Sequence, residues 1–271
     1  MALMDEFKKE RASIKKENFK VQFLYFWEYY KWYVLGPLLA IAFIIYYIYT
    51  SANAKDFAFY SVMLNSTEYH PYVSNTLELG THTVDEHADD FSAYINMDED
   101  KYWILLDTSI QIHDNPDERE TSEGIEKLVT YLNAGEIDTL VTGSSDFAEY
   151  AYDSQFHDLR EIMTPEQIAK YEPYFFYVDR KILDEVKVAM DNFDYSYQLI
   201  VPDPTKPEAM EDPIPVGIYV HDSQYLMNTF VFEETEIVMG IYVNAPHVET
   251  AFDYLDFLLD VPYEEATKLA E

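Results

Sequence analysis

The stretch 131–151, YLNAGEIDTLVTGSSDFAEYA, indicates the fold class of the chain. It begins as the end of a helix, stops at Gly135, continues as an apolar strand over 137–143 and opens a second helix after a short Ser/Asp loop. A strand between two helices is the repeating unit of an α/β domain. We therefore expect an α/β fold with a mostly parallel sheet around this stretch.

The same alternation continues on both sides of it. Further strands are expected at 57–65, 102–107, 195–201, 216–222 and 236–244, where aromatic and β-branched residues or short apolar runs occur. Further helices are expected at 122–134, 145–153, 164–174 and 247–260, where apolar residues recur at helical spacing or a capping pattern opens the segment. Between them, 202–215 carries five of the twelve prolines and is expected to be a surface loop.

The chain also contains one candidate membrane helix. No charged residue occurs between Lys31 and Lys55, and the 23 residues 32–54 would span about 34 Å as a helix, enough for a bilayer core of about 30 Å. Tyrosines and tryptophans are concentrated at both ends, as in a spanning helix. We expect a cytoplasmic and interfacial segment at 1–32, a transmembrane helix at 33–54 that contacts the lipid bilayer, and an extracytoplasmic domain at 55–271.

A cleaved signal peptide is the alternative interpretation of this segment. Ala52, Asn53 and Ala54 have the small-x-small form of a cleavage site. The 32 residues before the apolar run are longer than the usual start of a secretory leader and include their own aromatic stretch, VQFLYFWEYY. These features favour an uncleaved anchor.

Charge is distributed unevenly along the chain. Residues 1–32 hold seven of the 18 Lys/Arg and five of the 51 Asp/Glu, a net of +2, which leaves 11 Lys/Arg and 46 Asp/Glu, a net of −35, for residues 33–271. Basic flanks stay on the cytoplasmic side, so the amino terminus is expected inside and the acidic part outside. An acidic domain repels phosphates, which excludes nucleic acid as a partner. The absence of cysteine excludes disulfides and thiol chemistry.

The carboxyl ends of the expected strands provide candidate ligand contacts, because ligands of open α/β sheets bind where loops leave those ends. The candidate residues are Asn65, Ser66, Asp107, Thr108, Gly143, Ser144, Ser145 and Asp146. Gly143 is expected to allow a sharp turn, and Ser145 or Asp146 to cap the next helix. Turn and capping roles alone also explain these residue types. The carboxylate of Asp146 at a helix start argues against an anionic ligand.

Three segments resemble extracellular solute-binding proteins of the type 2 periplasmic-binding fold. They are LVTYLNAGEIDTLVTGSSDFAEYA (128–151), FHDLREIMTPEQIAKYEPYFF (156–176) and MGIYVNAPHVETAFDYLDFLL (239–259). The resemblance covers most of residues 120–260 and implies a module that presents a small solute, such as a sugar or peptide, to a transporter or sensor. Many family members are held by a lipid on an amino-terminal cysteine, whereas this chain has none and carries an apolar helix instead.

Two function classes therefore remain open. The first is a membrane-anchored module that binds a small solute. The second is an interaction or structural protein of the cell envelope that uses the same fold without a small ligand. A hydrolase is the weakest alternative, because the chain contains no G-x-S-x-G, P-loop or H-E-x-x-H motif. We expect no enzyme activity, cofactor or metal.

Two short regions could suggest metal binding, but neither has the required pattern. Lys101 stands where a calcium loop starting at Asn96 needs glycine. His70, His82 and His87 match no zinc spacing.

Overall fold

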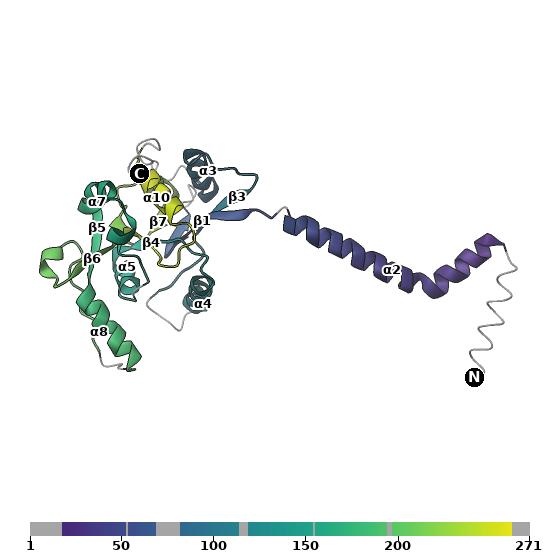
Figure 1. The fold of residues 1–271 in the computed structure, drawn as a ribbon, viewed down its shortest axis with the longest axis horizontal. Helices are drawn as coiled ribbons and strands as arrows, with labels where there is room; N and C mark the ends of the chain where they lie inside the picture. Colours follow the sequence, from purple (N-terminus) through teal and green to yellow (C-terminus); the bar gives the residue numbers. More distant parts are fainter. Residues whose placement is uncertain are drawn as a thin grey trace, which may run out of the picture. The chain divides into compact units, whose positions relative to one another are not determined.

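The computed structural model describes residues 18–52, 54–68, 82–113, 119–153, 155–193 and 197–261. Backbone contacts divide the chain into two units, Met1–Ala54 and Lys55–Glu271. Figure 1 shows helix α2 in the first unit and the mixed helices and strands of the second. The apolar segment and the α/β part therefore belong to different units.

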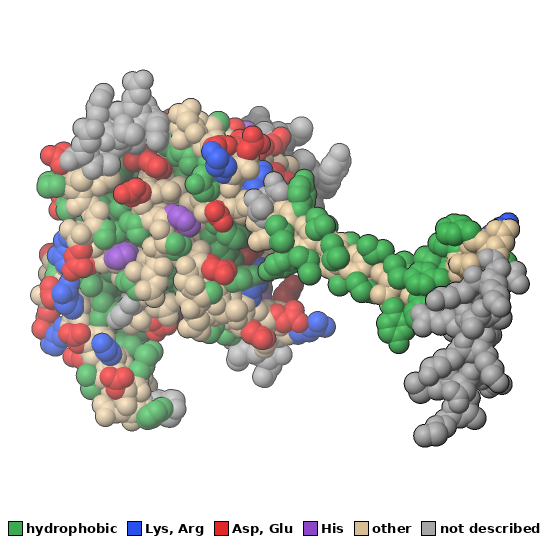
Figure 2. Space-filling model, turned by 45° about the vertical axis from the view of Figure 1, so that its right-hand side comes forward, with side chains coloured by type: hydrophobic (Ala, Val, Ile, Leu, Met, Phe, Trp, Pro, Cys, Tyr) green, Lys and Arg blue, Asp and Glu red, His purple; other side chains and the backbone are tan. Residues whose placement is uncertain are grey.

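Helix α2 spans Phe19–Ala52 and begins earlier than the expected membrane helix. Within it, the 22 residues Tyr30–Ser51 have a mean hydropathy of 1.8, and none of the most apolar stretch is buried. Hydrophobic side chains cover the visible surface of this helix in Figure 2. About 20 apolar residues are needed to cross a bilayer, so the described part of the chain contains one helix that is long and apolar enough.

The second unit is built on a six-stranded sheet with the order β3-β1-β4-β8-β6-β5. The strands are β1 (Asp56–Met63), β3 (Tyr102–Asp107), β4 (Thr139–Gly143), β5 (Phe175–Asp179), β6 (Pro213–Tyr219) and β8 (Ile237–Ile241). Strand β1 pairs in parallel with β3 and β4, whereas β8 is antiparallel to β4 and β6, and β6 is antiparallel to β5. The expected α/β class is confirmed, and the sheet is mixed, with its parallel part at β3-β1-β4.

Helices cover both faces of the sheet, because the strand side chains alternate between two apolar clusters. In β1, Phe59 and Met63 belong to one cluster, and Tyr60 and Val62 to the other. The first cluster includes residues of α3 (Val84–Tyr94), α6 (Leu159–Ile162), α7 (Pro165–Tyr171), α9 (Gln224–Thr229) and α10 (Val248–Leu258). The second includes residues of α4 (Arg119–Ala134), α5 (Ser144–Ala151) and α8 (Arg180–Asp191). The domain thus has three layers, helix, sheet and helix, as Figure 1 shows.

A second, two-stranded sheet pairs β2 (Ser66–Glu68) with β7 (Phe230–Phe232) in antiparallel orientation. Two short 3₁₀ helices, Glu172–Tyr174 and Pro207–Ala209, complete the described elements. The β2–β7 pair holds the chain that leaves β1 against the chain that leads into β8. It therefore fixes the loops beside the carboxyl end of β1.

One expected strand is wrong, and several described elements were not predicted, among them β5 and α8. Residues 197–201 of the expected strand 195–201 form no strand, and Tyr195 and Ser196 lie outside the described residues. The edge of the sheet is formed instead by β5, which is followed directly by α8. The side chain of Asp179 accepts a hydrogen bond from Lys181 N and caps α8, a start signal that is readable in the sequence.

Candidate functional site

Asn65 joins the loops that follow β1, β3 and β4. Its Nδ2 donates to Asp146 Oδ2 at 2.6 Å and to the carbonyl of Ile112 at 2.8 Å, and its Oδ1 accepts from Ile112 N at 2.7 Å. Asn65 has a φ of 53°, a left-handed conformation that asparagine tolerates better than most residues. The three loops therefore meet at one edge of the sheet, as the parallel strand order predicts.

Asp107 at the end of β3 is bonded from two sides. Its Oδ2 accepts from Lys127 Nζ at 2.8 Å and from the Tyr60 hydroxyl at 3.0 Å, and its Oδ1 accepts from Ser109 N at 2.8 Å. Burial acts to raise the pKa of Asp107, but the hydrogen bonds from Lys127 and Ser109 outweigh it and hold the pKa below its usual value. Asp107 is therefore a stable, ion-paired carboxylate that braces β3 against α4.

The backbone near Thr108 and Ser66 is bridged by one amide side chain. Gln111 Nε2 donates to the carbonyl of Ser66 at 2.7 Å and to that of Thr108 at 2.9 Å. The Ser66 hydroxyl donates to the carbonyl of Met63 at 2.7 Å. The carbonyl groups of Ser66 and Thr108 and the hydroxyl group of Ser66 therefore all have hydrogen-bond partners within the domain.

The start of α5 differs from the expectation. The helix begins at Ser144, and neither Ser145 nor Asp146 caps it: Asp146 accepts from Asn65 and Thr142 instead. The cap comes from the turn before β8, where Glu234 Oε2 accepts from Ser145 N at 3.1 Å.

Gly143 serves close packing rather than a sharp turn. Its φ of −58° is ordinary, but a Cβ there would lie 2.5 Å from the Glu234 carboxyl group. The absence of a side chain at this position is therefore what lets Glu234 reach the amino-terminal end of α5.

Asp146 lies in a partly buried, acidic environment. Burial raises the pKa of its carboxyl group, and the nearby charges of Glu234 and Glu233 raise it further, while the hydrogen bonds from Asn65 and Thr142 lower it. The net direction is upward. The sequence-based argument against an anionic ligand assumed that the Asp146 carboxylate occupies the start of α5, and that premise is wrong. The Glu234 carboxylate occupies it instead.

The structure thus brings all the predicted site residues together at one sheet edge, with their loops hydrogen-bonded to one another. No known protein family, curated protein or solved structure matches this chain. A functional assignment must therefore come from the contacts of its own residues.

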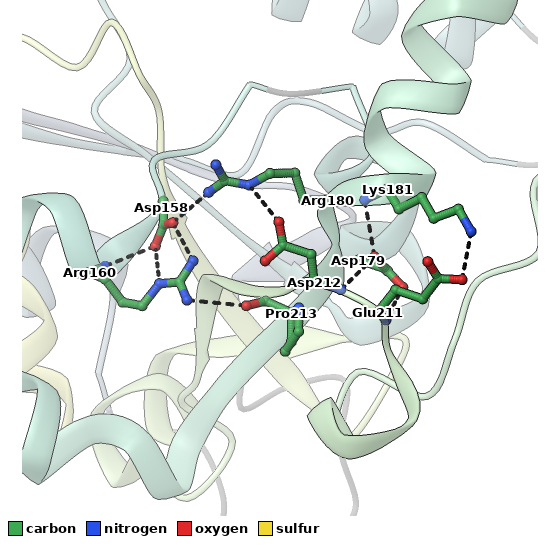
Figure 3. A network of polar contacts seen from close by, with 8 residues as sticks. All are labelled: Asp158, Arg160, Asp179, Arg180, Lys181, Glu211, Asp212 and Pro213. Atoms are coloured by element: carbon green, nitrogen blue, oxygen red, sulfur yellow. Dashed lines mark hydrogen bonds and ion pairs between the residues drawn. The ribbon is translucent and has the colours of Figure 1, made fainter.

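A polar network that the sequence analysis missed lies between α6 and the ends of β5 and β6 (Figure 3). Asp158 Oδ2 accepts from Arg160 Nη2 at 2.6 Å and from Arg180 Nη2 at 3.0 Å, and Arg160 Nη1 donates to the carbonyl of Pro213 at 3.2 Å. Burial acts to raise the pKa of Asp158, but the hydrogen bonds and charges of the two arginines hold it below its usual value.

The second half of this network is centred on Asp179. Asp179 is 4% exposed, and its carboxylate accepts from Glu211 N at 2.7 Å, Lys181 N at 3.0 Å and Asp212 N at 3.2 Å. Lys181 Nζ pairs with Glu211 at 2.6 Å. Every charged group in Figure 3 contacts an opposite charge or backbone donors. The network therefore connects β5, β6 and α8 and has a structural role.

Within the described residues, neither region considered for metals brings a ligand cluster together. In the described ranges, no group of three or more His, Asp or Glu side chains is placed to hold a metal ion. Asp98 pairs with Lys101 at 2.5 Å, and His87 is buried among aromatic rings. His70 lies outside the described residues.

Replacing Asn65 by glycine should lower the free energy of unfolding by about 2 kcal/mol. Ile112 N loses its acceptor and Asp146 loses one of its two side-chain donors, while the backbone conformation stays accessible. For a domain of this size, the lower free energy of unfolding corresponds to roughly 4–8 °C in melting temperature. Asn96→Gly is the matched control, since Asn96 has a φ of 51° but is exposed. Equal melting temperatures for the two variants would contradict a joining role for Asn65.

Proposed function

We propose that this chain is a single-pass membrane protein whose Lys55–Glu271 unit is an extracytoplasmic module for contact with another protein of the cell envelope. One observation carries this proposal. The loops at the carboxyl edge of the sheet are bonded to each other through Asn65, and Glu234 occupies the start of α5.

A solute site needs room and unused donors or acceptors. At this edge, the Asn65 amide, the Asp107 carboxylate and the Ser145 backbone N–H already have partners within the domain. A ligand there would have to replace contacts that are already made. A protein partner needs no such cleft, since it can bind a protruding surface.

The membrane part of the proposal is supported by composition and by helix α2. The 22-residue stretch Tyr30–Ser51 is followed by a domain that carries most of the negative charge. Short basic flanks remain on the cytoplasmic side of a membrane. The net charge of +2 on residues 1–32 therefore favours a cytoplasmic amino terminus.

Protease added to intact spheroplasts that express the full chain should remove residues 55–271 and leave the amino-terminal segment. An amino-terminal epitope tag and a carboxyl-terminal one, read by immunoblot, report the two sides. Loss of the amino-terminal tag with retention of the carboxyl-terminal one would reverse the proposed orientation. Release of the domain without protease, with a new start near Lys55, would show cleavage at Ala54.

Absence of a solute-induced thermal shift is the expected result for the purified full-length chain in nanodiscs. A ligand at a hundred times its dissociation constant would stabilise the fold by about 2.7 kcal/mol, which is roughly 5–11 °C for a domain of this size. A panel of sugars, amino acids and short peptides should produce no shift of this size. A shift that disappears in Asn65→Gly but persists in Asn96→Gly would place a solute at the sheet edge and overturn the proposal.

A solute-binding module is the second candidate, and a different location favours it. A cavity of about 530 Å³ lies between α7, α9 and the end of α10, lined by Tyr171, Tyr174, Tyr225 and Asp222 among others. The hydroxyl group of Tyr171 is buried without a hydrogen-bond partner in the described part of the chain. If the panel gives a shift, Tyr174→Ala should reduce it, because Tyr174 is exposed at this cavity.

A further inference from the structure

The carboxyl-terminal half of α8 exposes apolar side chains where a solvated helix would carry polar ones. Val188, Met190 and Phe193 are 59%, 58% and 75% exposed. Leu199, which lines a groove together with Met190 and Phe193, is 38% exposed. Only Leu183 and Val186 of this helix are buried, so its second half extends beyond the packed core. Figure 1 shows α8 projecting from the lower side of the domain.

Grooves of about 420 Å³ lie on either side of this helix end. Ala189 and Tyr197 line both of them, Val188 lines the first, and Met190 and Phe193 line the second. We call the following set the α8 surface: Val188, Ala189, Met190, Phe193, Tyr197 and Leu199. Grooves lined by apolar side chains next to a small residue can receive the side chains of a partner.

Phe193 is held in a costly conformation on this surface. It follows the carboxyl-terminal cap of α8 with a φ of 53°, a position where glycine is favoured and a bulky residue is strained. Its N–H donates to the carbonyl of Met190, which fixes the turn. A strained phenylalanine that is 75% exposed contributes little to the core, so its side chain is available for another contact.

The charges around the grooves select the class of partner. Glu149 and Asp153 line one groove, and Asp184 and Glu185 the other. Among the described residues, Lys181 is the only cation that lines either groove, and it is already paired with Glu211. A second copy of the chain, with a net charge of −33, would meet these carboxylates with like charge. A segment with apolar side chains beside lysine or arginine matches both the grooves and their rims.

We propose that the α8 surface is the docking site for a cationic amphipathic segment of a partner protein. This inference rests on the proposed function, since it names the surface and the partner class of the interaction module. Apolar side chains of the segment would enter the two grooves, and its basic side chains would face the rim carboxylates.

The test uses full-length chain in phosphatidylcholine nanodiscs and a fluorescent amphipathic peptide made only of leucine and lysine. Anisotropy should show saturable binding to loaded discs above that to empty discs, weakening with added salt. A leucine–glutamate peptide of the same spacing should not bind. Met190→Ser/Phe193→Ser should weaken binding by about tenfold or more, because two apolar anchors of the second groove are lost together. Ile125→Ser/Val129→Ser is the matched control, since these α4 residues are 42% and 49% exposed.

Phe193→Gly separates docking from stability. It relieves the left-handed strain, so the melting temperature should stay equal or rise while peptide binding weakens. A lower melting temperature would assign Phe193 a structural role and overturn the inference. The inference would also be overturned if the leucine–glutamate peptide bound as well as the leucine–lysine peptide, or if empty discs bound the peptide as well as loaded discs. The same holds if the α4 control lost as much binding as Met190→Ser/Phe193→Ser, or if the chain self-associated in a way that requires Phe193. If the peptide does not bind and the solute panel gives no thermal shift, the α8 surface is not the docking site, but the proposed function is unaffected. If a solute produces a thermal shift, the proposed function is overturned, whatever the result with the peptide.

Discussion

Replacing Asp138 by alanine should lower the free energy of unfolding of the domain by about 3–5 kcal/mol, because a fully buried acceptor of three hydrogen bonds is lost. Asp138 Oδ2 accepts from Tyr60 N at 2.9 Å and lies 3.1 Å from His247 Nδ1, and its Oδ1 accepts from His247 N at 2.7 Å. One carboxylate thus connects β1, the start of β4 and the start of α10.

The loss leaves two backbone N–H groups without an acceptor in a region that water does not reach. At 2–4 °C per kcal/mol, the melting temperature should fall by roughly 6–20 °C, measurable by circular dichroism. The melting temperature of Asp138→Asn should lie between those of the original chain and Asp138→Ala, since the carbonyl oxygen of the asparagine can still accept a hydrogen bond. Asp89→Ala, at an exposed position of α3, is the control and should change stability by less than about 0.5 kcal/mol. A similar small change for Asp138→Ala would show that the carboxylate does not hold these elements together.

Acidification from pH 6.5 to pH 4 should cost the domain about 3 kcal/mol through His87 alone. His87 is 1% exposed, and burial lowers its pKa to about 4. Its Nδ1 lies 3.1 Å from Thr229 Oγ1 and its Nε2 3.1 Å from the Tyr254 hydroxyl. Because the Thr229 hydroxyl donates to the carbonyl of Tyr225, a neutral ring with hydrogen on Nδ1 satisfies both neighbours.

The sign follows from the depressed pKa. Above pH 6.5, His87 is neutral in the folded and the unfolded chain, so it has no effect on the pH dependence. Below pH 6.5, His87 is protonated in the unfolded chain but stays neutral in the folded chain, so the free energy of unfolding falls until about pH 4. Urea unfolding of His87→Gln across this range should give a slope shallower by about 1.4 kcal/mol per pH unit, whatever its stability at neutral pH. Parallel slopes for the original chain and His87→Gln would contradict a neutral buried ring.

The sequence predicts the α/β class and most strands because their signals are local. The apolar run Tyr102–Asp107 is a strand as expected, and α10 lies within the expected helix 247–260. The strand predicted from apolar content is wrong at 197–201, where the residues are mainly exposed. Burial of such a segment depends on whether another strand pairs with it, and β5 takes the edge position instead.

The candidate site shows the same division between local and non-local information. The sequence predicts which loops meet, since parallel strands bring their carboxyl ends together. It does not predict that Asn65 would bond to Asp146, or that Glu234 would cap α5, because these contacts join residues 81 and 89 positions apart. The role of Asp138 was hidden for the same reason, since its partners lie 78 and 109 positions away.

The place of β8 in the sheet has a consequence for biosynthesis. This strand, Ile237–Ile241, is the last in the described chain, yet it is inserted between β4 and β6 and is the link that joins β3-β1-β4 to β6-β5. A nascent chain that ends before residue 237 can therefore make only two separate half-sheets, each with an open hydrogen-bonding edge. Folding of the domain has to wait until nearly all of it has left the ribosome and, in the proposed topology, the translocon. Premature termination even late in the message would leave aggregation-prone fragments rather than a shortened working domain.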